Sequence, residues 1–205
     1  MSTSPLLYPR HSILSAPIRL TAIAAAFLVT VLLAFPTSAQ RVDHLTDQEV
    51  ELIRDVQEVD LRMDIYTRAI ERRLIAILGR DTLDKEGLKR LEKESEKWGE
   101  LPEGSFSEIL ADIPRILDEA VNKIEDVAER DEKSELFPFA VYVLADHCRE
   151  LPGRLEKLRD RATTPRDVAL INDSIDQCSD IVEASAKVPR PDPKDRNKIK
   201  RKPRD

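Results

Sequence analysis

The stretch from Ser134 to Val188 has the pattern of two helices folded back on each other. Side chains suited to a core recur every three or four residues in both halves, which is the spacing of a helix packed lengthwise against a neighbour. They are Phe137, Val141, Leu144, Cys148, Leu151, Leu155 and Leu158, then Val168, Ile171, Ile175, Cys178, Val182 and Ser185. Between the halves, Thr164, Pro165 and Asp167 suit an N-cap, a first helical position and a capping box. The sequence therefore predicts an antiparallel helical hairpin.

Each half of this hairpin carries one cysteine. Cys148 and Cys178 stand 15 residues before and after Thr163, and residues equally far from the turn lie level in such a hairpin. With a rise of about 1.5 Å per residue, a one-residue error in the turn still leaves a distance that a disulfide spans. We expect a disulfide, worth about 3–4 kcal/mol for a loop of about 30 residues. Two reduced core thiols and a metal-binding pair are the alternatives.

The N-terminal segment has the pattern of an export signal. Basic residues precede an apolar run, Leu20–Phe35, and small residues before Gln40 fit signal-peptidase cleavage after Ala39. The run is short for a membrane span. We therefore expect residues 1–39 to be a cleaved signal and the protein to be periplasmic or secreted, where a level cysteine pair oxidises. The alternative is an anchor formed by an uncleaved N-terminal segment.

The remaining chain divides into an acidic body, residues 40–188, and a basic tail, residues 189–205. Four prolines and one aliphatic side chain in the tail cannot form a core, so we expect it to be disordered. Its cations could hold the protein near anionic lipid headgroups or another polyanion, at about 1 kcal/mol each. They are Arg190, Lys194, Arg196, Lys198, Lys200, Arg201, Lys202 and Arg204. Alternatively, the tail only solubilises the protein or folds loosely onto the acidic body.

Capping signals and apolar periodicity divide the rest of the body into helices. A capping box at Thr46 begins a first helix that we expect to continue for about 32 residues, as far as Gly79. A short, charged helix follows and ends near Gly99. It carries a row of lysines, 85, 89, 93 and 97, that either is a solvated face or touches an anionic partner. A further capping box at Ser105 begins a helix in which Pro114 causes a bend or a new start.

The predicted fold is all-α, an antiparallel bundle of four long helices plus one short helix, with a disulfide-clamped C-terminal hairpin. Within the hairpin, Pro152 and Gly153 are expected to kink or interrupt the first helix. We find no strand-like alternation of useful length.

The sequence offers little catalytic chemistry. After Ala39 only His44 and His147 remain, and neighbours on a helix such as His147 and Cys148 point about 100° apart. We interpret His147 as a half-buried structural side chain, with a metal or haem ligand as the alternative. Motifs for covalent haem, di-iron centres, phosphate loops and serine hydrolases are missing. We therefore expect no catalytic residues, cofactor or metal, and export disfavours a nucleic-acid partner.

Several residues carry a resemblance over about 35 positions. Leu45-Thr46-Asp47-Gln48-Glu49, Asp60-Leu61-Arg62, Tyr66 and Arg72-Arg73-Leu74 resemble the first helix of exported bacterial helical proteins that have no assigned activity. Leu45-Thr46 also resembles the Leu-Thr-x-x-Gln motif of small periplasmic chaperones and envelope-stress sensors, although Glu49 occupies the fifth position here.

These observations favour a non-enzymatic interaction or scaffold protein of the cell envelope. Its expected partner is an unknown envelope protein or an anionic surface, including peripheral contact with a membrane through the tail. The alternative is a periplasmic chaperone or envelope-stress sensor that binds unfolded chains.

Overall fold

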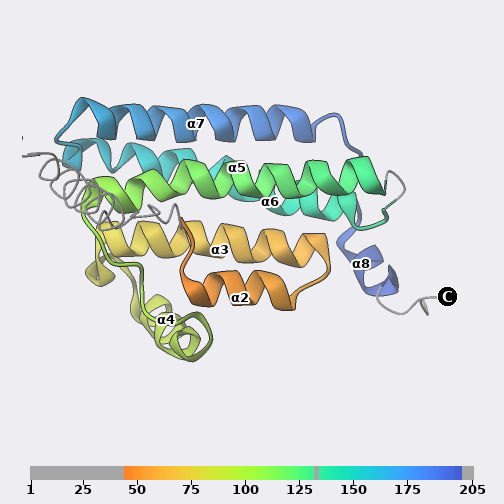
Figure 1. Cartoon of the computed structure of the whole chain (residues 1–205), viewed down its shortest axis with the longest axis horizontal. Helices are drawn as coiled ribbons and strands as arrows, with labels where there is room; N and C mark the ends of the chain where they lie inside the picture. Colours follow the sequence, from red (N-terminus) through yellow and green to blue (C-terminus); the bar gives the residue numbers. More distant parts are fainter. Residues whose placement is uncertain (1–43, 132–133, 200–205) are drawn as a thin grey trace, which may run out of the picture. The chain divides into compact units, whose positions relative to one another are not determined.

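The computed structural model describes residues 44–131 and 134–199. These ranges contain seven α-helices and no strand, so the all-α prediction is confirmed (Figure 1). The helices are α2 (Asp47–Asp55), α3 (Val59–Leu78), α4 (Lys85–Trp98), α5 (Phe106–Arg130), α6 (Phe137–Glu156), α7 (Pro165–Ser185) and α8 (Pro193–Ile199). Single 3₁₀ turns, Arg80–Thr82 and Arg159–Arg161, follow α3 and α6.

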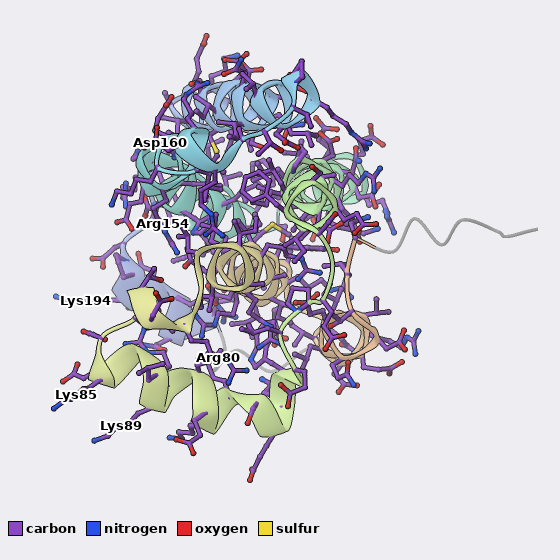
Figure 2. The ribbon with its side chains drawn as sticks, turned by 90° about the vertical axis from the view of Figure 1, so that its left-hand side faces the viewer. Arg80, Lys85, Lys89, Arg154, Asp160 and Lys194 are labelled. Atoms are coloured by element: carbon purple, nitrogen blue, oxygen red, sulfur yellow. The ribbon has the colours of Figure 1, made fainter. Side chains whose placement is uncertain are left out.

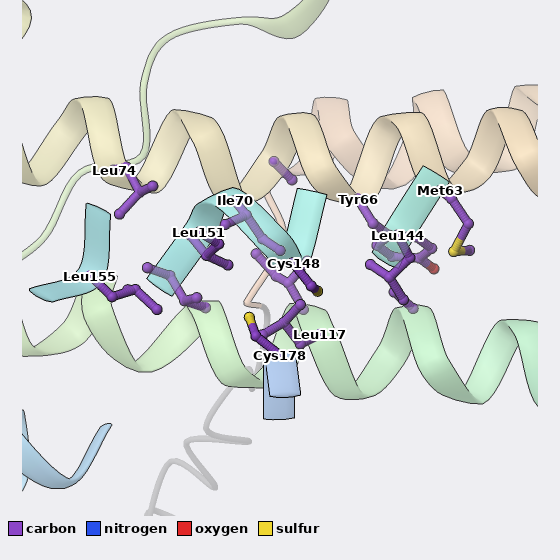
Figure 3. Packing of buried hydrophobic residues seen from close by; sticks show 14 of the residues in the cluster. Met63, Tyr66, Ile70, Leu74, Leu117, Leu144, Cys148, Leu151, Leu155 and Cys178 are labelled. Atoms are coloured by element: carbon purple, nitrogen blue, oxygen red, sulfur yellow. The ribbon is translucent and has the colours of Figure 1, made fainter. Parts of the chain in front are cut away.

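Helices α3, α5, α6 and α7 run lengthwise beside one another and form a helical bundle (Figure 1). Helix α3 packs against α5 and α6, and α7 packs against the same two helices from the other side. Contacts between α5 and α6 themselves are fewer, which makes them diagonal neighbours. The buried side chains between these helices form one core (Figure 3). It includes Met63, Tyr66, Ile70 and Leu74 from α3, Leu117 from α5, and Leu144, Leu151 and Leu155 from α6.

The predicted caps begin three of the helices. Thr46, Ser105 and Thr164 each accept a hydrogen bond from the backbone N–H three residues later, and the acidic side chain at that later position closes the capping box. This reciprocal pairing satisfies donors that the first helical turn leaves free. Pro165 stands at the first position of α7, where its missing N–H is harmless.

The prediction of one long first helix is wrong, because the chain breaks between α2 and α3. Val56 is extended, with φ −103° and ψ 125°, and α2 folds back along α3. The side-chain Nε of Arg62 donates to the Val56 carbonyl at 2.7 Å and satisfies the backbone at the break. The apolar repeat continues through this point, so periodicity alone does not reveal it. The fold-back buries Glu49 beside Arg73, a tertiary contact that local sequence does not report.

The prolines interrupt neither long helix. Helix α5 is continuous through Pro114, and α6 is continuous through Pro152 as far as Glu156, so of the kink or interruption predicted there the interruption does not occur. Leu151 and Leu155 are fully buried on either side of Pro152. Packing of this apolar seam holds the helix together where proline removes one backbone hydrogen bond.

The prediction that residues 189–205 are disordered is wrong for part of the segment. Residues Pro193–Ile199 form α8, and Arg196 pairs with Asp60 of α3. Composition indicates that this segment cannot form a core of its own. It does not reveal that the acidic body supplies a carboxylate, Asp60, that pairs with Arg196 of the segment. Lys200, Arg201, Lys202 and Arg204 lie outside the described residues.

The predicted signal or anchor, residues 1–39, also lies outside the described residues. Among the helices that are described, none has both the length and the apolar composition required to cross a membrane.

Candidate functional site

Two buried arginines of α3 form the centre of an ionic cluster that sequence analysis did not predict. Arg72 and Arg73 are 0% and 1% exposed. Arg73 Nη1 lies 2.5 Å from Glu49 Oε1 of α2, and Arg73 Nε lies 3.5 Å from Asp112 Oδ2 of α5. Arg72 Nε lies 3.5 Å from the same Glu49 oxygen. Burial raises the pKa of Asp112, and Arg73 opposes that shift. The cluster therefore fastens α2 and α5 to α3.

Arg72 also fixes the end of α4. Its Nη2 donates to the backbone carbonyls of Trp98, Gly99 and Glu100 at 3.1, 3.0 and 2.5 Å. A cation at these carbonyls suits the negative end of the helix dipole. The guanidinium carbon also lies 5.7 Å from the centre of the Trp98 ring, within the range of a cation–π contact. Burial lowers the pKa of Arg72. Arg72 therefore holds the C-terminal end of α4 against α3.

A second polar group connects α3 to α5 through the Glu119 carboxylate. His44 Nε2 and the Tyr66 hydroxyl lie 2.7 Å from its two oxygens. The bond to His44, followed by that to Tyr66, lowers the pKa of Glu119, whereas burial raises it. The pKa of Tyr66 is raised, first by burial and then by this hydrogen bond. The Glu119 carboxylate thus accepts hydrogen bonds from both donors. It connects His44, which precedes α2, and Tyr66 of α3 to α5.

His147 lies in α6 with its side chain 14% exposed, in agreement with the interpretation of a structural residue. Its Nδ1 lies 3.7 Å from Glu71 Oε1 of α3, and Arg154 pairs with the same carboxylate. Its Nε2 is buried and makes no hydrogen bond. Within residues 44–131 and 134–199, no three His, Cys, Asp or Glu side chains are arranged to hold a metal ion. The contacts of His147 are those of a packed core histidine.

Replacing His147 by glutamine is expected to make stability less dependent on pH. Burial lowers the pKa of His147 below its ordinary value of 6.5, so the unfolded chain takes up the proton first. Above pH 6.5 neither state carries the proton, and the histidine does not lower the free energy of unfolding. As the pH falls below 6.5 toward the folded-state pKa, protonation of the unfolded chain lowers the free energy of unfolding. Urea unfolding at about pH 7.5 and about pH 5.5 measures the difference. An equal loss of stability in both proteins contradicts this assignment.

The two cysteines lie close together, as the hairpin geometry predicts. Their side chains are 3.7 Å apart and unbonded, so the disulfide itself stays a prediction (Figure 3). Both residues are buried in the core. Their mutual hydrogen bond, together with burial, raises the pKa of Cys148. This suppresses the thiolate, the form that reacts.

The cations predicted for polyanion binding do not form one exposed set. Arg190 pairs with Asp146, and Arg196 pairs with Asp60 in a contact where the two side chains are 13% and 6% exposed. Lys198 pairs with Asp195 on α8 itself. Lys194 is exposed. The body thus neutralises two of the four described cations of the tail.

The lysine row lies on an outlying helix. Arg72, as above, and Arg68, which pairs with Glu94, connect α4 to α3. Lys85 and Lys89 extend away from the rest of the molecule, and Lys93 and Lys97 are exposed as well (Figure 2). Glu86, Glu92 and Glu96 are also exposed on this helix. This mixture of charges favours a solvated face.

An apolar groove opens where the bundle ends near the C-terminus of α7. It has a volume of about 500 Å³ and is lined by α5, α6 and α7. Six of its apolar side chains are only half-buried, namely Val121, Ile124, Phe137, Val141, Ile181 and Val188. We call this feature the α5/α6/α7 groove. Its lining residues come from the diagonal neighbours α5 and α6 and from α7, which packs against both.

The charged residues that line the groove are all acidic. Asp118, Glu125 and Asp180 belong to its lining, which contains no lysine or arginine. Asp118 and Asp180 also line a neighbouring hollow between α5 and α7, together with Asp173 and Asp176. That hollow also includes Arg115 and Arg166. The surface therefore combines an apolar floor with a mostly acidic rim.

Sequence analysis found some residues of the groove but not the groove itself. Phe137, Val141 and Leu144 belong to the predicted seams, and a seam predicts burial along its whole length. The buried cluster had a weak signal, since Glu49, Tyr66, Arg72 and Arg73 are among the residues that carry the resemblance. Nothing in the spacing shows that two adjacent arginines both turn inward.

Comparisons of the chain with protein-family models, with curated proteins and with solved structures found no match.

Proposed function

We propose that this chain is an exported, non-enzymatic interaction protein that docks a helix of another envelope protein in the α5/α6/α7 groove. The supporting observation is the set of half-buried apolar side chains that three helices present around one hollow. Contiguous exposed apolar surface is typical of interaction sites. Helix-in-groove docking needs such a surface between helices.

The acidic rim specifies the occupant as an amphipathic helix with basic flanks. Its apolar face covers the floor, and its lysines or arginines face Asp118, Glu125 and Asp180. The groove and the neighbouring hollow extend along α7 from Leu170 to Ser185, roughly 22 Å at about 1.5 Å per residue, and the groove also reaches Val188 beyond the end of that helix. A helix of about 18 residues spans that length. Complementary charge also accelerates association and selects against acidic partners.

We further propose that α3, α5, α6 and α7 act as one antiparallel four-helix unit, clamped by a Cys148–Cys178 disulfide after export. Two observations support the disulfide. The two cysteines are equally far from the turn between α6 and α7, and their side chains are 3.7 Å apart. A disulfide near the middle of α6 and α7 holds two walls of the groove together without occupying it.

The test uses a fluorescently labelled amphipathic peptide of about 18 residues, with leucines on one face and lysines beside them, and a matched peptide with glutamate in place of lysine. Fluorescence anisotropy is expected to show at least about tenfold tighter binding of the lysine peptide. Val121→Lys places a cation in the groove and is expected to reduce binding of that peptide at least about tenfold. Val168→Lys, at an exposed valine of α7, is the matched control and leaves binding unchanged.

The proposal fails if the lysine peptide does not bind, or if Val121→Lys and Val168→Lys bind it equally. Circular dichroism of both variants establishes that they are folded. Peptide that binds without becoming helical supports the alternative, a chaperone for unfolded chains, and contradicts helix docking.

A further inference from the structure

The segment after α7 returns to the bundle at the end where the groove lies. We call residues 186–199, which include α8, the C-terminal strap. Val188, near its start, lines the groove together with Ser185, the last residue of α7. The position of the strap therefore determines one end of the proposed docking surface.

Side chains of α6 hold the start of the strap through hydrogen bonds, a cation–π contact and an ion pair. The Tyr142 hydroxyl donates toward the backbone carbonyls of Ser185 and Val188, at 3.2 and 2.9 Å. Arg190 lies over the Tyr142 ring, 4.7 Å from its centre, and pairs with Asp146 at 2.6 Å. Because Tyr142 binds both the strap backbone and the Arg190 side chain, displacement of Arg190 weakens the position of Val188.

The far end of the strap is held on α3. Arg196 makes a two-point contact with Asp60, which includes Nη2 to Oδ1 at 3.0 Å. The Asp60 side chain is 6% exposed, so this pair is shielded from solvent. Pro138 and Phe139 of α6 line a hollow with Pro191 and Ile199 of the strap. This combination of a shielded ion pair and apolar contact anchors α8 to the bundle.

We infer that the docked strap pre-forms the groove, so that peptide affinity depends on the contact of Asp60 with Arg196, which lies eight residues beyond Val188 of the groove lining. The inference rests on the proposed function, because it concerns the regulation of the same site. When the strap is released, Val188 leaves the groove wall and must be ordered again on binding. The apparent dissociation constant equals the intrinsic one divided by the fraction of molecules in the competent state, so it rises as that fraction falls.

The experiment measures binding of the lysine peptide to three altered proteins: Arg196→Gln, the chain truncated after Val188, and the control Lys198→Gln. Lys198 pairs with Asp195 of its own helix, so its variant keeps the anchor. We expect roughly three- to tenfold weaker binding for Arg196→Gln and for the truncated chain, and no change for Lys198→Gln. Amide hydrogen exchange of Lys187 and Val188, which donate to the carbonyls of Ala184 and Ser185, is expected to accelerate in the first two proteins.

The outcomes separate the two proposals. If unaltered protein does not bind the peptide, the proposed function fails and this inference fails with it. If unaltered protein binds and Val121→Lys does not, but Arg196→Gln and the truncated chain bind within twofold of it, the groove stands and the strap inference is overturned. Faster exchange without weaker binding also overturns it, and so does tighter binding after truncation, because the strap then blocks the groove.

Discussion

Replacing Glu49 by glutamine is expected to lower the free energy of unfolding by about 3–5 kcal/mol, which is the usual effect of removing one partner from a buried ion pair. The Glu49 side chain is fully buried, 2.5 Å from Arg73 and 3.5 Å from Arg72. Glutamine keeps the size of the side chain but leaves two buried guanidinium groups without this carboxylate. Reversible guanidinium chloride unfolding, followed by circular dichroism, measures the change.

Glu51→Gln is the matched control for this experiment. Glu51 lies two positions along the same helix and pairs with Arg54, but the two side chains are 60% and 67% exposed. Exposed pairs contribute about 0–1 kcal/mol, so this variant is expected to remain close to the unaltered protein. Equal effects of the two substitutions contradict the role assigned to the buried cluster.

Oxidation of Cys148 and Cys178 is expected to raise the free energy of unfolding by about 3–4 kcal/mol relative to the reduced protein, because a loop of about 30 residues is closed in the unfolded chain. The side chains need to approach from 3.7 Å to bonding distance, about 2.05 Å between sulfurs. Burial and the raised pKa of Cys148 make the folded thiols slow to react. The bond is therefore expected to form during folding. Unfolding of protein prepared with and without reductant gives the difference.

Cys178→Ala separates the disulfide from the effect of the reductant. This substitution prevents the disulfide from forming. The free energy of unfolding of the variant is therefore expected to be the same with and without reductant. Alkylation of the denatured, non-reduced protein provides a direct count of free thiols. Two alkylated cysteines in protein exported by its host contradict the proposed clamp.

The regular part of the fold could be predicted from the sequence. Three capping boxes and the hairpin between α6 and α7 depend on spacing within a few turns of helix, where local hydrogen bonds and one packed neighbour decide the outcome. The same symmetry about the turn placed Cys148 and Cys178 near each other.

The errors arise where distant parts of the chain meet. The break at Val56 is supported by burial of Glu49 against Arg73, 24 positions later. Helix α8 is held by an ion pair between Arg196 and Asp60, 136 positions apart. Composition identifies a segment that cannot fold by itself, but it does not identify a surface elsewhere in the chain that binds the segment.

The candidate site is difficult to predict for a related reason. Apolar periodicity marks Phe137 and Val141 as core positions, although the bundle leaves them only half-buried. The difference depends on how α5, α6 and α7 pack around the hollow, which local spacing does not determine. The acidic rim cannot be recognised in the sequence, because acidic residues occur throughout this chain. Only the fold shows that Asp118 and Asp180 lie beside the same hollow.

The most direct measurement of the groove's role is a methyl NMR titration of the oxidised protein with the lysine peptide. We expect chemical-shift changes at Val121, Ile124, Val141, Ile181 and Val188, together with unchanged signals from the buried Ile75 and Ile77 near the C-terminal end of α3. Changes that instead centre on Val168, or that spread evenly over all methyl groups, contradict docking of a basic amphipathic helix in the α5/α6/α7 groove.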